Sequence, residues 1–341
     1  MADPAELRAA VAAGEAARFG GQNLLAGVFV ALALVFATVA AALGDTFFFR
    51  LATEALLLAG LAMAVDVLLG YAGLLSLGHA LFFGFGAYAS ALVLKNVAPS
   101  FWAATGITLL AATLLGLVAG FISIRARGVY FALITFGLAQ VVFKAVYNTR
   151  EIGGSDGIIG IPQIKIEFGL FSVQADSPAG FFLLTLAIIM LCYAALAYLA
   201  RAPYGRLLSA IRTNESRVPF LGFSPWRVKL VAFVIAADVA ALAGSLYPML
   251  RGFVSPELFA FQASGNAVIM VILGGTGTLA GALYGASILT ALKSVIGTWT
   301  EHHLIIIGAL FMLSVIFLPL GLAGYALPRI QRWLARRGAA P

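Results

Sequence analysis

The chain has 341 residues, of which 62% are hydrophobic and only 10% are charged. A soluble domain of this size does not have such a composition, and apolar runs of 18 or more residues recur along the sequence. The sequence therefore predicts an all-α polytopic membrane protein without a soluble domain of its own. The net charge of +7 does not indicate nucleic-acid binding, because there is no basic tract with interleaved aromatic residues.

About ten transmembrane helices are expected, some of them broken by glycine, with both termini in the cytoplasm. They are predicted at 23–43, 50–69, 74–94, 101–124, 129–147, 179–200, 229–250, 258–273, 279–296 and 304–327. Glycine breaks single out spans three and nine as candidates for re-entrant helices. Residues 1–22 form an expected cytoplasmic segment, and 328–341 a cytoplasmic tail. We expect the first span to be retained, because its apolar run is long for a signal peptide.

The distribution of basic residues sets the orientation. Fourteen of the 21 Lys and Arg residues fall in segments that this topology places in the cytoplasm, in line with the positive-inside rule. The one long loop on the other side, at 148–178, is expected to be periplasmic. It holds four acids against two bases, and these acids are Glu151, Asp156, Glu167 and Asp176.

The longest charged interruption of the membrane-spanning region runs from Arg201 to Lys229. It carries six basic residues against a single acid, Glu215. One interpretation is a surface built for a cytoplasmic partner. The other is a solvated loop, at 201–228, that only sets the topology.

Short helices are expected inside this loop. A helical pattern opens at Gly205, and Asn214 is typical of the N-cap of a second short helix that Gly222 ends. Ser224 followed by Pro225 predicts the start of the next helix, because proline is favoured at the first helical position.

Few residues suggest chemistry. The sequence has no Walker A pattern and no Cys/His cluster, so we expect neither an ATPase site nor a metal site on this chain. Asp238 lies about nine residues into span seven, near the expected bilayer midplane, and should face the bundle interior because an acid in hydrocarbon is costly. A functional and a structural role both stay open for it. Glu54 and Asp66 lie nearer the ends of their span, where solvation is easier.

Glycine clusters are more informative than any single acid. They are GYAGLLSLGHALFFGFGAY at 70–88 and GGTGTLAG at 274–281. Broken helices of this kind often line substrate pathways, although tight packing explains them as well. The pathway candidates are Tyr71, Ser76, Gly78, His79, Asp238, Gly274, Gly275 and Gly277. A faint likeness between 78–95 and 281–298 is interpreted as shared composition, since an inverted five-plus-five repeat would pair span three with span eight.

Several motifs together resemble a known family. They are the 70–88 cluster, RGVYFALITFGLAQVV at 127–142, TREIGGSDGI at 149–158, the segment at 204–244, VSPELF at 254–259 and MVILGGTGTLAGALYGA at 270–286. In this order, from about residue 50 to 325, they resemble the LivM-type permease of bacterial branched-chain amino-acid ABC importers. Pro219 departs from the pattern and predicts a short or kinked second helix in the loop.

The resemblance implies a multi-pass protein of the bacterial inner membrane that pairs with a LivH-type second permease. It also implies two cytoplasmic ATPase subunits, which bind ATP and Mg, and a periplasmic substrate-binding protein. No cofactor is expected on this chain. The implied ATPase-coupling residues are Tyr204, Gly205, Arg206, Arg212, Asn214, Glu215 and Gly222.

Two alternatives stay open. Members of the family also transport other amino acids, urea, short amides and aromatic acids, so the substrate is not fixed by the resemblance. A self-contained ion-coupled carrier or channel that uses Asp238 is the alternative mechanism, although a carrier has no need of a docking loop.

Overall fold

The computed structural model describes residues 4–338 except 163, 168–171, 175–176 and 300–302. The α-helices are α1 (Pro4–Leu43), α2 (Thr46–Asp66), α3 (Ala80–Asn96), α4 (Phe101–Ser123), α5 (Val129–Asn148), α6 (Pro178–Arg201), α7 (Pro203–Asn214), α8 (Pro225–Ser245), α9 (Tyr247–Arg251), α10 (Phe261–Gly274), α11 (Leu279–Trp299), α12 (His303–Phe317) and α13 (Gly321–Gly338). A π-helix, η1 (Val67–Ala72), extends α2, and the short 3-10 helices are η2 (Arg150–Ile152), η3 (Gly154–Asp156), η4 (Glu215–Leu221) and η5 (Pro256–Phe259). Four strands of two or three residues are described: β1 (Ile158–Ile159), β2 (Lys165–Glu167), β3 (Ser172–Gln174) and β4 (Phe253–Val254).

The prediction of an all-α polytopic membrane protein is confirmed. Within the described residues, eight helical stretches are long and apolar enough to cross a membrane, and α3 and α10 are shorter apolar helices. The short helices thus correspond to predicted spans three and eight. Span nine was singled out wrongly, because α11 (Leu279–Trp299) is a full-length helix that begins directly after the glycine turn.

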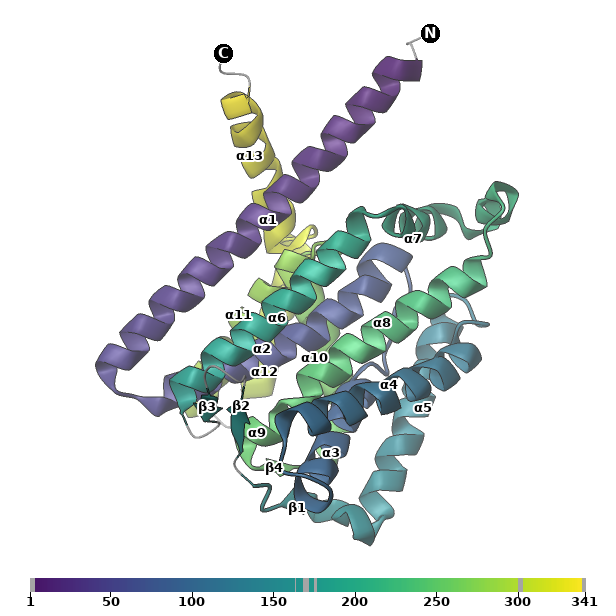
Figure 1. Cartoon of the computed structure of the whole chain (residues 1–341). Coiled ribbons are helices and arrows are strands. Elements are labelled where there is room, and N and C mark those ends of the chain that lie inside the picture. The colour runs from purple at the N-terminus through teal and green to yellow at the C-terminus, as the bar shows by residue number, and fades with distance from the viewer. Residues whose placement is uncertain (1–3, 163, 168–171, 175–176, 300–302, 339–341) are drawn as a thin grey trace.

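The boundaries at the two ends of the chain also differ from the expected ones. Residues 4–22 of the predicted segment and the first span form one continuous helix, α1, and the predicted tail begins inside α13. The predicted span at 304–327 is interrupted between α12 and α13 by a turn that ends at Gly321, whose positive φ of 65° is readily adopted only by glycine. Figure 1 shows the start of α1, the end of α13 and α7 at the same end of the molecule.

The packing of the helices follows an inverted repeat. In the centre α2 packs against α8, and these two helices run in opposite directions. In the first half α3 packs on α4 and both pack on α8, whereas in the second half α10 packs on α11 and both pack on α2. Span three therefore corresponds to span eight, as a five-plus-five inverted repeat requires. The likeness between 78–95 and 281–298 does not follow this correspondence.

Small residues allow the central helices to approach closely. A Cβ atom built on Gly86 of α3 would lie 2.2 Å from the carbonyl oxygen of Ala241, and one on Gly244 would lie 2.0 Å from that of Phe83. Glycine at these two positions lets the backbones of α3 and α8 touch, which is how helices associate when hydrocarbon surrounds them.

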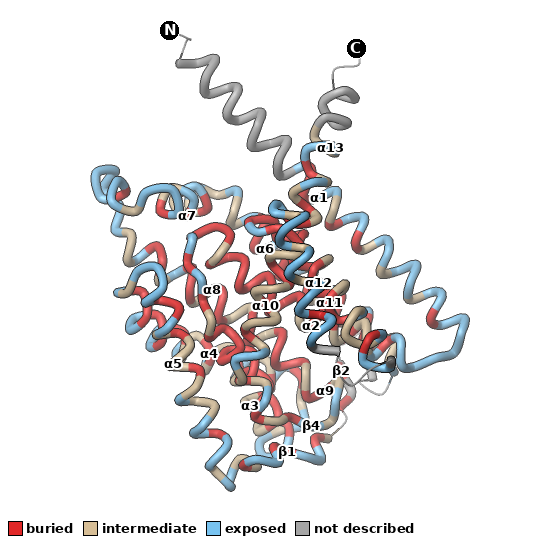
Figure 2. The backbone as a smooth tube through the Cα atoms, turned by 180° about the vertical axis from the view of Figure 1, so that it is seen from behind, coloured by how far each residue is buried: buried red, intermediate tan, exposed pale blue. Residues whose placement is uncertain are grey.

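The outer helices expose apolar side chains, as lipid contact requires. Leu110 and Leu114 of α4, Val141 of α5 and Leu43 of α1 are each more than 60% exposed. Figure 2 shows the exposed outer turns of these helices around a buried centre. An apolar surface of this extent is typical of the lipid-facing side of a membrane protein.

The end of the bundle opposite to α7 is closed by a small strand pair. Strand β1 pairs with β4 in antiparallel fashion, with Ile158 opposite Val254. Gly157 lies directly on this junction, because a Cβ there would meet the Val254 carbonyl oxygen at 1.9 Å. The loop expected to be periplasmic is thereby attached to the connection between α9 and α10 (Figure 1).

Candidate functional site

The helix α7 lies flat across one end of the bundle, where α6 ends (Figure 1). It begins with Pro203 and buries Gly205, Leu208 and Ile211 on one face. A Cβ on Gly205 would lie 2.2 Å from the Ala200 carbonyl oxygen, so only glycine permits the tight turn from α6 into α7. The predicted short helix is confirmed, and it begins two residues earlier than expected.

Tyr204 attaches this helix to the start of α8. Its hydroxyl group donates a hydrogen bond of 2.8 Å to the Val228 carbonyl oxygen. Burial raises the pKa of the Tyr204 hydroxyl above its ordinary value, so the hydroxyl stays protonated and remains a donor at neutral pH. The hydrogen bond joins α7 directly to the start of α8.

The second predicted helix is confirmed as a 3-10 helix, η4. It begins after Asn214, whose backbone is extended, and ends at Gly222, which has a positive φ of 82°. Pro219 lies inside η4, where it cannot donate a backbone hydrogen bond, in agreement with the predicted short helix. The following helix starts at Pro225 with Ser224 as its N-cap residue, as predicted.

Glu215 neutralises a buried cation beneath the loop. Its Oε1 atom lies 2.8 Å from Nζ of Lys229 and 3.7 Å from a guanidinium nitrogen of Arg127. The side chain of Lys229 is only 3% exposed, and a buried ammonium group is costly unless it is paired. The single acid of the loop therefore holds η4, α8 and the turn before α5 together.

Arg212 points from α7 into the bundle. Its Nη1 atom donates a hydrogen bond to the Gly70 carbonyl oxygen in the π-helix η1. A π-helix frees carbonyl groups from the regular helical pattern, and such bulges often occur at functional sites. The side chain of Arg212 thus supplies a donor for backbone that the break at the end of α2 exposes.

The glycine turn at 274–281 meets the same break. The backbone N–H of Gly277 donates a hydrogen bond of 2.7 Å to Oδ1 of Asp66, and the Gly277 carbonyl oxygen lies 3.5 Å from Nε2 of Gln22. A Cβ on Gly70 would lie 2.3 Å from the Asp66 carboxylate and 2.4 Å from Gly277 N. Only glycine at position 70 lets η1 and the turn lie against each other.

These contacts join residues that the sequence placed in different groups. Arg212 belongs to the predicted coupling residues and Gly277 to the predicted pathway residues, and both contact η1. The expectation that Asp66 is readily solvated is wrong, because its side chain is fully buried. Neither Asp66 nor Gln22 was expected to contact the turn. The only local signal was the position of Asp66 four residues before Gly70.

The break between η1 and α3 is filled by side chains. The Oγ atom of Ser76 lies 3.1 Å from Nδ1 of the fully buried His79. The imidazole ring packs edge-on against the rings of Phe82 and Phe233, at centroid distances of 5.3 and 5.5 Å. Gly78 lies directly on the backbone of α5, because its Cβ would be 1.9 Å from the Thr135 carbonyl oxygen.

The remaining pathway candidates lie in two places. Tyr71 is buried in η1, and Gly274 and Gly275 form the turn before α11. Asp238 lies apart from them, on the face of α8 that packs against α4, where its Oδ1 atom accepts a hydrogen bond of 2.9 Å from Thr113. The described contacts therefore join the glycine turn to η1 but do not join Asp238 to either.

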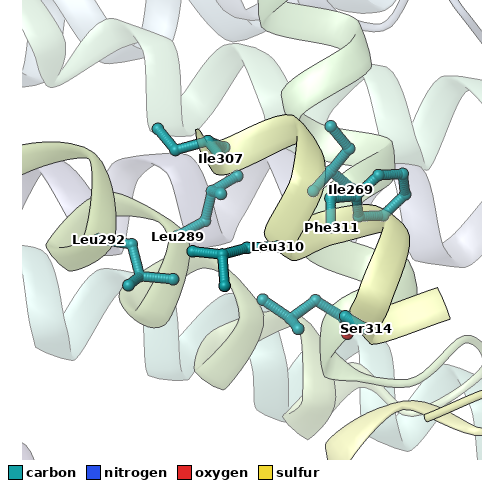
Figure 3. A pocket seen from close by; sticks show the side chains of 8 residues that line it. Ile269, Leu289, Leu292, Ile307, Leu310, Phe311 and Ser314 are labelled. Atoms are coloured by element: carbon teal, nitrogen blue, oxygen red, sulfur yellow. The ribbon is translucent and has the colours of Figure 1, made fainter. Parts of the chain in front are cut away.

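One hollow near these helices is too small and too apolar for a polar solute. Figure 3 shows it between α10, α11 and α12, with a volume of about 40 Å³. Its lining is hydrocarbon except for Ser314. A void of this kind reflects imperfect packing against α12.

Comparisons with known proteins agree on one family. Residues 47–315 match the family model described as branched-chain amino acid transport system, permease component. The chain is 34% identical over 301 residues to the high-affinity branched-chain amino acid transport system permease protein LivM of Escherichia coli. The aligned region covers 82% of this chain and 70% of that protein.

Other curated relatives are more distant. The permease protein LivH of Salmonella typhimurium is 26% identical over 196 residues, which cover 57% of this chain and 59% of that protein. The autoinducer 2 import system permease protein LsrC of Salmonella paratyphi B is 29% identical over 198 residues, or 55% and 54% of the two chains. No solved structure matches the chain with significance.

Proposed function

Because the chain belongs to the family of permease components of branched-chain amino acid transport systems, we propose that it is the LivM-type membrane subunit of an ABC importer. In this proposal it forms a heterodimer with a LivH-type permease in the bacterial inner membrane. A periplasmic binding protein delivers a branched-chain or related amino acid, and two cytoplasmic ATPase subunits bind ATP and Mg and drive transport.

The observation that carries this proposal is the link from an exposed surface to the buried glycine turn. The surface consists of η4 and the residues around it, which we call the docking tip: Arg217, Phe220, Leu221, Phe223 and Arg227. Phe220 is 90% exposed. Aromatic and arginine side chains that stand free in this way are typical of protein–protein interfaces.

A loop that only sets topology needs none of these contacts. The docking tip is attached through Glu215 and Lys229 to α8, and α7 is attached through Arg212 to η1. A displacement of the docking tip by a partner would therefore reach the glycine turn through packed elements and hydrogen bonds. This is the arrangement that an ATP-driven permease requires, because its energy source is bound by a separate subunit.

Cross-linking tests the proposed contact. The only native cysteine, Cys192, is buried in α6, so a thiol introduced by Phe220→Cys is the reactive one. We expect it to cross-link to an ATPase subunit in the assembled complex. A matched thiol at Ser155, at the other end of the bundle, should give no such product. Equal cross-linking at both positions, or none at Phe220, would contradict the proposed docking tip.

A further inference from the structure

A second polar region lies at the end of the bundle opposite to the docking tip. It is a cleft of about 510 Å³ between α2, α10 and the α9–η5 connection, with single contributions from α3 and α5. Its lining residues are Glu54, Leu58, Leu61, Phe83, Phe143, Tyr247, Ser255, Glu257, Leu258, Ala260, Gln262, Ala263 and Asn266. Small-molecule sites are typically clefts of about 300–1,000 Å³ that combine apolar walls with a few polar groups.

The cleft is apolar inside and polar at its mouth. Leu61 and Phe83 are buried, whereas Glu257 and Gln262 are exposed. Along α2, the lining residues Glu54, Leu58 and Leu61 follow at helical spacing, so they form one stripe that starts with the acid and becomes apolar toward the bundle centre. A molecule with a charged end and an aliphatic end fits such a gradient.

The charges at the mouth have both signs. Arg251 forms an ion pair with Glu54, and Tyr247 lies within electrostatic reach of Arg251, Glu54 and Glu257. Among the described residues Glu257 is in no ion pair, so its carboxylate is available for a cation. The amide groups of Gln262 and Asn266 supply donors for an anion on the α10 side.

The inverted repeat allows the cleft beside α10 to be compared with the equivalent position beside α3. The cleft lies where η5 leads into the short helix α10, and the corresponding position in the first half is the break that leads into α3. There the space is filled by His79 between Phe82 and Phe233. The protein is thus open beside α10 and closed beside α3.

We propose that this cleft is the entry site for the transported solute, and that it takes a zwitterionic α-amino acid with an aliphatic side chain. The ammonium group pairs with Glu257, the carboxylate accepts hydrogen bonds from Gln262 and Asn266, and the side chain packs on Leu58. The assignment rests on the proposed function and names a substrate class and a site for it. Partial replacement of water by these groups lowers the cost of dehydrating the zwitterion.

Thiol protection in the complete transporter complex tests the assignment. A thiol introduced by Gln262→Cys should react with a charged, membrane-impermeant reagent, and saturating leucine should slow this reaction at least threefold. The analogue 4-methylpentanoate lacks the ammonium group and 3-methylbutylamine lacks the carboxylate, so neither should protect. Leucine should leave the rate at a Ser155→Cys thiol unchanged.

A second substitution identifies the cation site. Combined with Gln262→Cys, Glu257→Gln should abolish protection by leucine, whereas Glu151→Gln, an exposed acid in η2, should preserve it. An unreactive thiol at position 262, protection by all three compounds, or protection that survives Glu257→Gln would overturn the entry site. If the unmodified complex meanwhile hydrolyses ATP in response to leucine and the binding protein, the proposed function stands. If leucine does not stimulate ATP hydrolysis by the unmodified complex, both proposals fail.

Discussion

Gly70→Ala probes the contact between η1 and the glycine turn most selectively. The added methyl group would lie 2.4 Å from Gly277 N and 2.3 Å from Oδ1 of Asp66, against an ordinary contact of at least 3.4 Å. The turn must therefore move by about 1 Å. Overpacking costs about 1–3 kcal/mol, and loss of the buried Gly277–Asp66 hydrogen bond adds about 1–3 kcal/mol. The higher helix propensity of alanine offsets about 0.5–1 kcal/mol of this destabilisation.

The expected net loss is about 1–5 kcal/mol in the free energy of unfolding, measured by denaturation of the purified protein in detergent. ATP hydrolysis stimulated by leucine and the binding protein should also fall, because the turn no longer lies on η1. Gly137→Ala is the matched control, since a Cβ at that position in α5 meets nothing within 4 Å. If the two variants behaved alike in both assays, the contact between η1 and the turn would not have the importance assigned to it.

Three further predictions concern charge, topology and the acid in α8. Arg206→Glu combined with Arg217→Glu should leave membrane insertion intact and abolish substrate-stimulated ATP hydrolysis, and normal stimulation would argue against docking. Arg212 is left unchanged in this variant because it contacts Gly70 inside the bundle. A thiol from Ser155→Cys should react with an impermeant reagent in intact cells, whereas labelling only after lysis would reverse the topology. Asp238→Asn should lower the transport rate but keep it ATP-dependent, because its partner is Thr113 of α4; complete loss of transport would favour an ion-coupled carrier.

Helix boundaries that depend on residues adjacent in the sequence were predicted correctly. The loop helices begin after Asn214 and Ser224, which have extended backbones but make no side-chain capping hydrogen bond, and η4 ends at Gly222, which has a positive φ. These preferences act over one or two residues, so the sequence displays them directly. The glycine break at the end of α2 was visible for the same reason.

Features that depend on packing were not predicted. The predicted span at 258–273 begins inside the 3-10 helix η5, and α10 starts only at Phe261. The bond between Asp66 and Gly277 joins residues 211 positions apart, and no local pattern signals it. The entry cleft is assembled from six elements, α2, α3, α5, α9, η5 and α10, whose lining residues are spread from Glu54 to Asn266 in the sequence.

Uptake by proteoliposomes tests the central claim most directly. The vesicles would contain this chain with its second permease and ATPase subunits, with ATP enclosed on the side of the docking tip and binding protein with labelled leucine on the other. We predict uptake that requires both ATP hydrolysis and the binding protein and that persists when an ionophore removes the proton gradient. Uptake by this chain alone, driven by a proton gradient without ATP, would contradict the account.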